Sequence, residues 1–156
     1  FNGGIIMAID NPNWDFRLVE QNNTATTLAA SSSWTYLDQS SAFTVATASP
    51  VKISYNLIHH YEQGATNCSY ILDLLNASDD SVVASSNYMQ VAKQGQGGNM
   101  AYGAHYMNWT FYNTAAGSYK VRVRGRNMGN ASTTHITNYF APNVNQQDQL
   151  VITYQA

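Results

Sequence analysis

The sequence predicts an all-β fold, either a β-sandwich or a jelly roll of about nine or ten antiparallel strands. Segments of alternating apolar and polar residues recur along the chain, and turns rich in Gly, Asn, Ser and Pro separate them. No segment shows a convincing helical period. The clearest strand is residues 117–128, G-S-Y-K-V-R-V-R-G-R-N-M, where Tyr119, Val121 and Val123 share one face.

The opposite face of this segment carries four of the seven Lys and Arg residues, namely Lys120, Arg122, Arg124 and Arg126. Same-face neighbours on a strand lie about 7 Å apart, so the four charges repel one another unless an anion neutralises them. The anion can be an acid on a neighbouring strand, an acid of another subunit or an external ligand. We expect an interface or an anion-binding stripe, with a plain solvated face as the alternative. In this hypothesis Arg122 and Arg124 pair across a subunit boundary and Arg126 meets an anionic ligand.

The first half of the chain is divided by clear turn signals. Residues 1–10 are read as a short strand or arm, and the turn at 38–41 separates two short strands. Pro50 precedes a strong strand at 51–61, in which Val51, Ile53, Tyr55, Leu57 and His59 share one face. The predicted strands in this half are 14–21, 24–30, 34–36, 43–46 and 51–61.

The second half begins with residues 68–75, which are apolar on both faces, as expected for a central strand. Residues 76–80 predict a turn because Asn, Asp and Ser bond readily to nearby backbone groups. Residues 94–99 are read as a flexible loop. The further strands are 81–91, 100–113, 117–128, 131–140 and 149–154. The predicted core is Ile53, Tyr55, Leu57, Leu72, Leu74, Tyr119, Val121 and Val123.

Composition bounds the function. Charged residues make up only 10% and the formal net charge is −2, which argues against nucleic-acid binding. The polar, Tyr-rich surface is typical of extracellular proteins. No apolar run reaches the roughly 18 residues that span a membrane, so we expect no membrane insertion. The chain begins at Phe1 without a Met, so we expect a mature product or a fragment.

Catalytic and metal sites are not indicated. The single cysteine, Cys68, excludes an intrachain disulfide and is expected to pack as a small buried side chain, with an interchain disulfide as the minor alternative. His59 and His60 are adjacent and face opposite sides of a strand. The nine acids are scattered, and no hydrolase or metalloprotease motif occurs. We therefore expect no enzyme activity, no cofactor and no metal, with a His59–His105 metal pair as a minor alternative.

Two kinds of carbohydrate site are indicated. Aromatic rings beside amide side chains can stack on a sugar and bond its hydroxyls, with core or interface packing as the alternative. The candidate glycan-binding residues are Gln96, Asn99, Tyr102, Tyr106 and Trp109. Five N-x-S/T sequons occur, of which Asn22, Asn76 and Asn130 fall in predicted turns and are the candidate N-glycosylation sites.

Several stretches in order resemble the C1q/TNF-like jelly-roll family, especially the heads of phage, viral and bacterial surface fibres. Residues 34–37 with 43–45 resemble its early strand pair, and S-P-V-K-I-S-Y at 49–55 is similar to its small, Pro, apolar, Lys strand. A-G-S-Y-K-V-R-V at 116–123 resembles its A-G-x-Y-x-V-x-V strand. Residues 150–154 are placed like its closing strand. The resemblance covers about residue 29 to the end, and it implies trimers around a threefold axis.

The sequence thus predicts an N-terminal arm with the first strands at 1–28 and a C1q/TNF-like jelly roll at 29–156, in one continuous domain. The expected function is that of a non-enzymatic, homotrimeric structural and recognition head on a viral fibre, capsid or extracellular appendage. Its partner would be a cell-surface glycan or protein receptor, and its location extracellular or on the virion surface. The alternatives are a filament subunit joined by strand exchange through the apolar residues 4–9, and a carbohydrate-binding module.

Overall fold

A computed structural model of the chain describes residues 16–22, 26–28, 33–61, 66–93, 101–128, 135–137 and 148–155. These residues form twelve β-strands and no helix, and every strand pair is antiparallel. The all-β prediction is confirmed. The predicted strand 81–91 is two strands in the structure, since β7 (Val82–Ser85) and β8 (Met89–Lys93) are separated at residues 86–88.

The first sheet is built around the long strand β5 (Ser49–Tyr61). On one side β5 pairs with β9 (Ala101–Thr114) along almost its whole length. On the other side it pairs with β12 (Asp148–Tyr154) and, farther along, with β11 (His135–Thr137). The outermost strands are β1 (Phe16–Asn22), paired with β12, and β2 (Thr26–Leu28), paired with β11.

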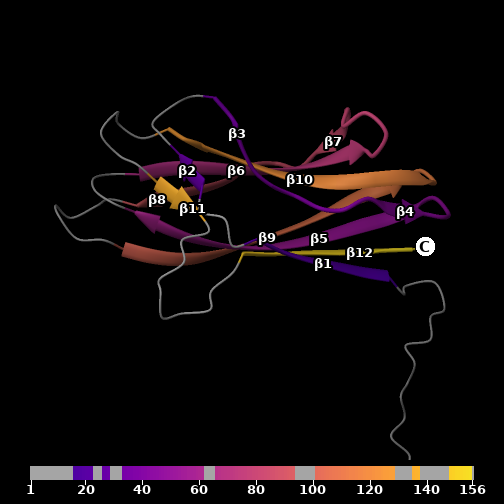
Figure 1. Ribbon diagram of the computed structural model, residues 1–156, viewed down its shortest axis with the longest axis horizontal. Helices are drawn as coiled ribbons and strands as arrows, with labels where there is room; N and C mark the ends of the chain where they lie inside the picture. Colours follow the sequence, from indigo (N-terminus) through magenta and orange to yellow (C-terminus); the bar gives the residue numbers. More distant parts are fainter. Residues whose placement is uncertain are drawn as a thin grey trace, which may run out of the picture.

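The second sheet is built around β6 (Thr66–Asn76) and β10 (Gly117–Asn127), which pair with each other. Beyond β10 lie β3 (Thr35–Gln39) and β4 (Phe43–Val45). Beyond β6 lie β7 and β8. Figure 1 shows the two sheets as layers, with β3, β6, β7 and β10 in one and β1, β5, β9 and β12 in the other.

The two sheets share one hydrophobic core, formed by the alternate residues that face the space between them. All eight predicted core residues are buried there, and none is more than 8% exposed. The period-two pattern therefore assigned the correct face to β5 and β10, and the two core residues predicted on β6, which was read as apolar on both faces, are buried as well. The side chain of His59, predicted on the same face of β5, lies outside the described residues.

Gly125 makes close packing across the core possible. It occupies a buried, core-facing position of β10, where a Cβ atom would lie 2.8 Å from Leu37 Cδ1, 3.0 Å from Leu28 Cδ1 and 3.1 Å from Tyr70 Cε1. Only glycine leaves room for these three side chains. The β10 backbone therefore approaches the core closely at this point.

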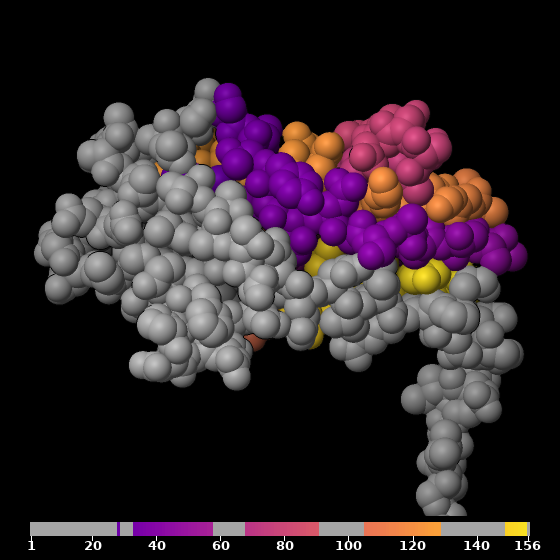
Figure 2. Space-filling view, in the orientation of Figure 1, coloured from indigo at the N-terminus to yellow at the C-terminus, as the bar shows by residue number. Residues whose placement is uncertain are grey.

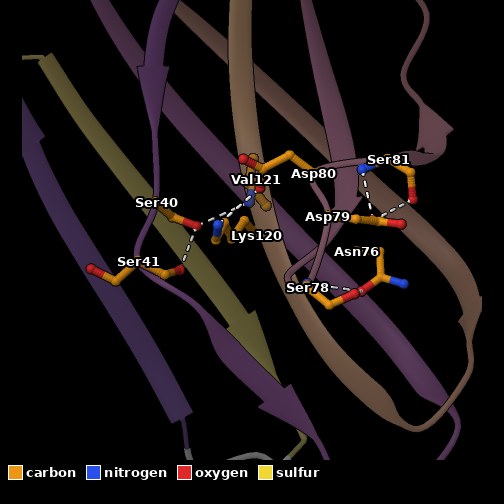
Figure 3. Close-up of polar contacts among 9 residues, drawn as sticks. All are labelled: Ser40, Ser41, Asn76, Ser78, Asp79, Asp80, Ser81, Lys120 and Val121. Atoms are coloured by element: carbon orange, nitrogen blue, oxygen red, sulfur yellow. Dashed lines mark hydrogen bonds and ion pairs between the residues drawn. The ribbon is translucent and has the colours of Figure 1, made fainter.

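The turn between β6 and β7 confirms the signal at residues 76–80 (Figure 3). The backbone N–H of Asp80 donates to Asn76 O at 3.0 Å, and Asp79 Oδ1 accepts from Ser81 N at 3.0 Å and from Ser81 Oγ at 2.7 Å. Asp80 adopts a φ of 57°, a left-handed conformation that Asp tolerates better than most residues. Figure 2 shows the rose-coloured segment around this turn projecting beside the orange β10.

Candidate functional site

The cation row, defined as Lys120, Arg122, Arg124 and Arg126, lies on the outer face of the second sheet. Its side chains alternate along β10 with the core residues, and each is half-buried. The sequence prediction that all four share one face is therefore confirmed. The acids that pair with these cations come from the neighbouring strand and its turn.

Asp73 of β6 is the counter-charge at the centre of the row. It lies directly opposite Arg122 in the β6–β10 register, and its side chain is fully buried. Its Oδ2 accepts a hydrogen bond from Arg122 Nε at 3.1 Å and lies 3.0 Å from Arg122 Nη2. Both contacts are to one carboxylate oxygen, and because donor and acceptor are ionised the hydrogen bond is of the strong, charge-assisted kind.

Arg124 reaches the same carboxylate from the next outward-facing position. Its Nη2 donates to Asp73 Oδ1 at 2.8 Å, and its Nε lies 2.6 Å from Oδ2 without directing its hydrogen along that line. Ser85 of β7 adds a third donor, since its Oγ lies 2.7 Å from Oδ1. One buried carboxylate thus holds two arginines and a hydroxyl, so it is well supplied with donors.

The two ends of the row differ from its centre. Lys120 Nζ lies 2.8 Å from Asp80 Oδ1 in the turn after β6, where the Asp80 side chain is half exposed. Arg126 instead lies over the ring of Trp34, with its guanidinium carbon 4.4 Å from the ring centre. The corresponding Arg124 distance to Trp34 is 5.6 Å, so both guanidinium groups contact this ring electrostatically.

These contacts supply a partner that the sequence hypothesis left open. Arg122 and Arg124 are paired with Asp73 of the same chain, on a neighbouring strand, and a further pairing across a subunit boundary stays a prediction. A variant lacking both arginines would leave Asp73 buried and unpaired, so it would weaken the fold as well as any contact between subunits. That the row faces another subunit or an anion remains a prediction.

The edge hollow is a second candidate site, formed where β9 meets the link between β7 and β8. It has a volume of about 230 Å³ and lies at one lateral edge of the sandwich. Tyr106 and Tyr88 are 70% and 57% exposed, so both rings are available at its rim. Its lining consists of Ser86, Asn87, Tyr88, Met89, Tyr106, Met107, Asn108 and Trp109.

A larger hollow of about 470 Å³ adjoins it on β5 and β9, and the two share Asn108 and Trp109. Lys52, Ser54 and Tyr112 line this second hollow. Ser54 Oγ and Asn108 Oδ1 lie 2.7 Å apart and hold the amide in place. Fixed amides between exposed tyrosines are the groups that bind a sugar hydroxyl and a sugar face.

The predicted glycan-binding residues are only partly brought together. Tyr106 and Trp109 both line the edge hollow, although the Trp109 ring packs partly against the core. Tyr102 lies opposite His60 in the strand register, and its side chain is outside the described residues, as are Gln96 and Asn99 entirely. The glycan prediction is therefore carried by Tyr106 and Trp109.

The predicted glycosylation sites are described to different extents. Asn76 is exposed at the end of β6, where the turn begins, and its Oδ1 accepts from Ser78 N at 3.1 Å and from Ser78 Oγ at 3.0 Å. Asn22 ends β1 and its side chain lies outside the described residues, as does all of Asn130. Modification at all three positions stays a prediction.

The remaining reactive groups do not assemble into a site. The part of the chain that the structure describes holds no group of three or more His, Cys, Asp or Glu residues suited to a metal ion. His105 lies opposite Leu57, two positions from His59 on β5, whose side chain is not described. Burial lowers the pKa of His105 and favours its neutral form. Cys68 is fully buried, and burial raises the pKa of its thiol to about 12.

Three residues of these sites were missed from the sequence. Asp73 was counted among scattered acids, yet its place within the apolar run 68–75 was the available signal, because a charge inside a central strand needs a partner. Trp34 was read only as part of an early strand. Tyr88 was placed inside a predicted strand, although Ser85-Ser86-Asn87 before it is a turn signal.

Comparison with known proteins gives weak similarities. No protein-family model and no curated protein matches the chain. It is similar in structure to the infectious bursal disease virus VP2 subviral particle, at 14% identity, 92% of this chain, 38% of that chain and a TM-score of 0.43. For the T13 particle of that virus the identity is 11%, with 92% of this chain and 36% of that chain covered and a TM-score of 0.44. For the T=1 particle derived from the virus the identity is 12%, with 92% of this chain and 37% of that chain covered and a TM-score of 0.38.

The chain thus spans well under half the length of these virus-particle proteins, and similarity at this level carries no function across. Within its described part the chain contains no helix of the length and hydropathy that crossing a membrane requires.

Proposed function

We propose that the chain is a non-enzymatic, homotrimeric structural and recognition head with a C1q/TNF-like jelly-roll fold, carried on a viral fibre, capsid or extracellular appendage. The observation that supports it most is the order of the strands. Among the described residues, each sheet has four strand positions from one edge to the other. Four of the eight positions are each shared by two strands, namely β1 with β2, β3 with β4, β7 with β8, and β11 with β12.

Eight strand positions divided between two packed sheets are the pattern of a jelly roll. The chain passes from one sheet to the other at nearly every connection, starting in the first sheet with β1 and β2 and ending there with β11 and β12. Among the described strands, the one connection that stays within a sheet and reaches a new strand position is that from β6 to the β7–β8 pair. This order supports the resemblance drawn from residues 34–55, 116–123 and 150–154.

The exposed apolar side chains support assembly and recognition. Tyrosine and other large apolar groups are enriched in interfaces, because they bury much area at low cost in side-chain entropy. Among the described residues, the large apolar side chains that are about half exposed or more are Tyr36, Val82, Val83, Tyr88, Tyr106, Tyr112 and Met128. A trimer interface burying more than about 1,000 Å² would cover part of this set.

The mass of the assembled protein tests this proposal. Native mass spectrometry of the whole chain at micromolar concentration is expected to give species built from three copies. A protein present only as monomers, or only as dimers, would overturn the trimeric head. Both results are readable whether or not a ligand is known.

The edge hollow favours a glycan as the partner, with the carbohydrate-binding module as the second candidate function. Binding of the assembled protein to an array of cell-surface glycans is expected, and Tyr106→Ala should reduce it at least tenfold. Tyr36→Ala, on an edge strand of the other sheet, is the matched control and should bind like the unchanged protein. No binding to any glycan would leave a protein receptor as the partner and remove the carbohydrate-binding module.

A further inference from the structure

Strand β9 is an edge strand of unusual length. It runs for 14 residues, and among the described strands it pairs only with β5. Its other side therefore presents alternate backbone N–H and C=O groups over a length of roughly 45 Å. Such an edge is a template for a further strand unless something blunts it.

The other outer strands carry the features that normally block pairing. Strands β2, β3, β4, β7 and β8 are three to five residues long. Register shifts interrupt the pairing of β3 with β10 and of β7 with β6. The longer outer strand β1 carries the charged residues Arg17 and Glu20, and the short strand β8 also carries Lys93.

Strand β9 is long and carries no such charges, and its pairing with β5 is regular from Ala101 to Phe111, with one register shift between Phe111 and Thr114 at its end. Its sequence, A-Y-G-A-H-Y-M-N-W-T-F-Y-N-T, contains no Lys, Arg, Asp, Glu or Pro. Its single titratable imidazole, His105, is half-buried and held toward the neutral form. A long, uncharged edge of this kind is either an aggregation hazard or a binding surface.

The surroundings of β9 favour a binding surface. Tyr106 and Tyr112 are 70% and 76% exposed on its outer face, and Tyr88, Val82 and Val83 are exposed on the neighbouring edge of the second sheet. The edge hollow between these strands offers a recess for side chains that alternate along an added strand. Backbone bonds with alternate side chains in pockets are the elements of recognition by strand addition.

We propose that β9 docks against β9 of a second copy of this chain, antiparallel and around a twofold axis. Self-pairing fits this edge because neither strand brings an ionised side chain, so no like charges meet across the contact. Each copy also brings the exposed Tyr106 and Tyr112 of its β9 to the contact, so the same surface meets itself, as in a twofold interface. The contact is independent of the proposed trimer, and in a trimer it would join two trimers to each other.

A charge placed on the edge tests the pairing. Tyr106→Lys adds an ionised side chain to an exposed position of β9, and twofold pairing brings two such charges close together. Sedimentation velocity measures the protein concentration at which the mass of the particle doubles. For Tyr106→Lys this concentration should be at least tenfold higher than for the unchanged protein. Thr44→Lys, with the same charge at an exposed position of β4, is the matched control and should associate like the unchanged protein.

Hydrogen exchange locates the contact and keeps the test decisive. Backbone amides of residues 101–114 should exchange more slowly at concentrations where the mass is doubled, and this protection should be absent in Tyr106→Lys. A doubled mass without protection of β9, no association at all, or growth into open polymers would each overturn the proposal. If Tyr106→Lys no longer doubles in mass but keeps a mass of three copies, the β9 contact is independent of the trimer interface.

Discussion

Asp73 and Arg122 face each other in register on β6 and β10, with the arginine Nε 3.1 Å from a carboxylate that is fully buried. The cation row is therefore held in place by an ion pair with a buried carboxylate of the same sheet. Of the four cations, Arg122 and Arg124 share Asp73, Lys120 meets Asp80, and Arg126 stacks on Trp34. Arg126 is the member whose described contact leaves its charge uncompensated by an acid, so it is the best placed to meet an anion.

Asp73→Asn should lower the free energy of unfolding by roughly 3 kcal/mol, because two half-buried guanidinium groups lose their shared counter-charge. Urea unfolding followed by tryptophan fluorescence measures the change. The control is Asp80→Asn, which breaks the exposed pair with Lys120 and should cost at most about 1 kcal/mol. Equal costs for the two variants would show that Asp73 does not anchor the row.

Val121→Asp tests the register of β10. The Val121 side chain is fully buried, so an aspartate there would place an unpaired charge in the core and cost several kcal/mol or prevent folding. Ser118→Asp puts the same group at an exposed position of the same strand and should fold normally. Near-ultraviolet circular dichroism reports the native packing, and a native spectrum for Val121→Asp would mean that the assigned face of β10 is wrong.

Gly125→Ala should destabilise the fold by about 1–3 kcal/mol, because the added methyl group overlaps Leu28 and Leu37 across a packed core. Gly117→Ala is a useful comparison, since its nearest neighbours are atoms of the Tyr119 ring at 3.2–3.3 Å, farther away than the 2.8 Å contact at Gly125. Thermal melting of both proteins should place Gly125→Ala well below Gly117→Ala. The opposite order would contradict the close approach described for β10.

Cys68 makes stability depend on pH in alkaline solution. Burial raises the pKa of its thiol from 9.0 to about 12, so between these values the unfolded chain loses a proton that the folded chain keeps. Stability should therefore fall as pH rises above 9, by up to about 1.4 kcal/mol per pH unit from this group.

Cys68→Ala lacks this contribution and provides the control, because the tyrosines that also ionise in this range remain in both proteins. The difference in unfolding free energy between the two proteins should be constant below pH 9 and change above it. In addition, a thiol reagent at pH 8 should label Cys68 only after unfolding. Rapid labelling of the native protein would contradict the burial of this side chain.

The fold was predictable to the extent that it depends on periodicity. Alternation along β5 and β10 identified their core faces from local sequence alone. The split between β7 and β8 was not found, because Ser86 satisfies its polar group by a contact that only the folded chain provides: its Oγ accepts from Leu72 N at 3.0 Å. Local turn chemistry pointed to a break there, and the longer alternating pattern outweighed it.

The candidate sites depend on contacts between strands far apart in the sequence, and this limited their prediction. The cation row was visible because it lies on one strand. Its partner Asp73 lies 49 residues earlier, and no local pattern indicates which acid stands opposite Arg122. The edge hollow likewise combines Tyr88 with Tyr106 from different sheets. Strand pairing determines the first site and the packing of the two sheets determines the second, so residue spacing along the sequence determines neither.

The number of chains in the assembled protein tests the proposed head most directly. Sedimentation equilibrium of the whole chain over the micromolar range is expected to fit masses of three copies, with six copies appearing as β9 pairing joins two trimers. In Tyr106→Lys the three-copy mass should remain. A mass of one copy at every concentration, or a mass that does not rise above two copies, would contradict the trimeric head. A mass of two copies would still agree with the β9 contact.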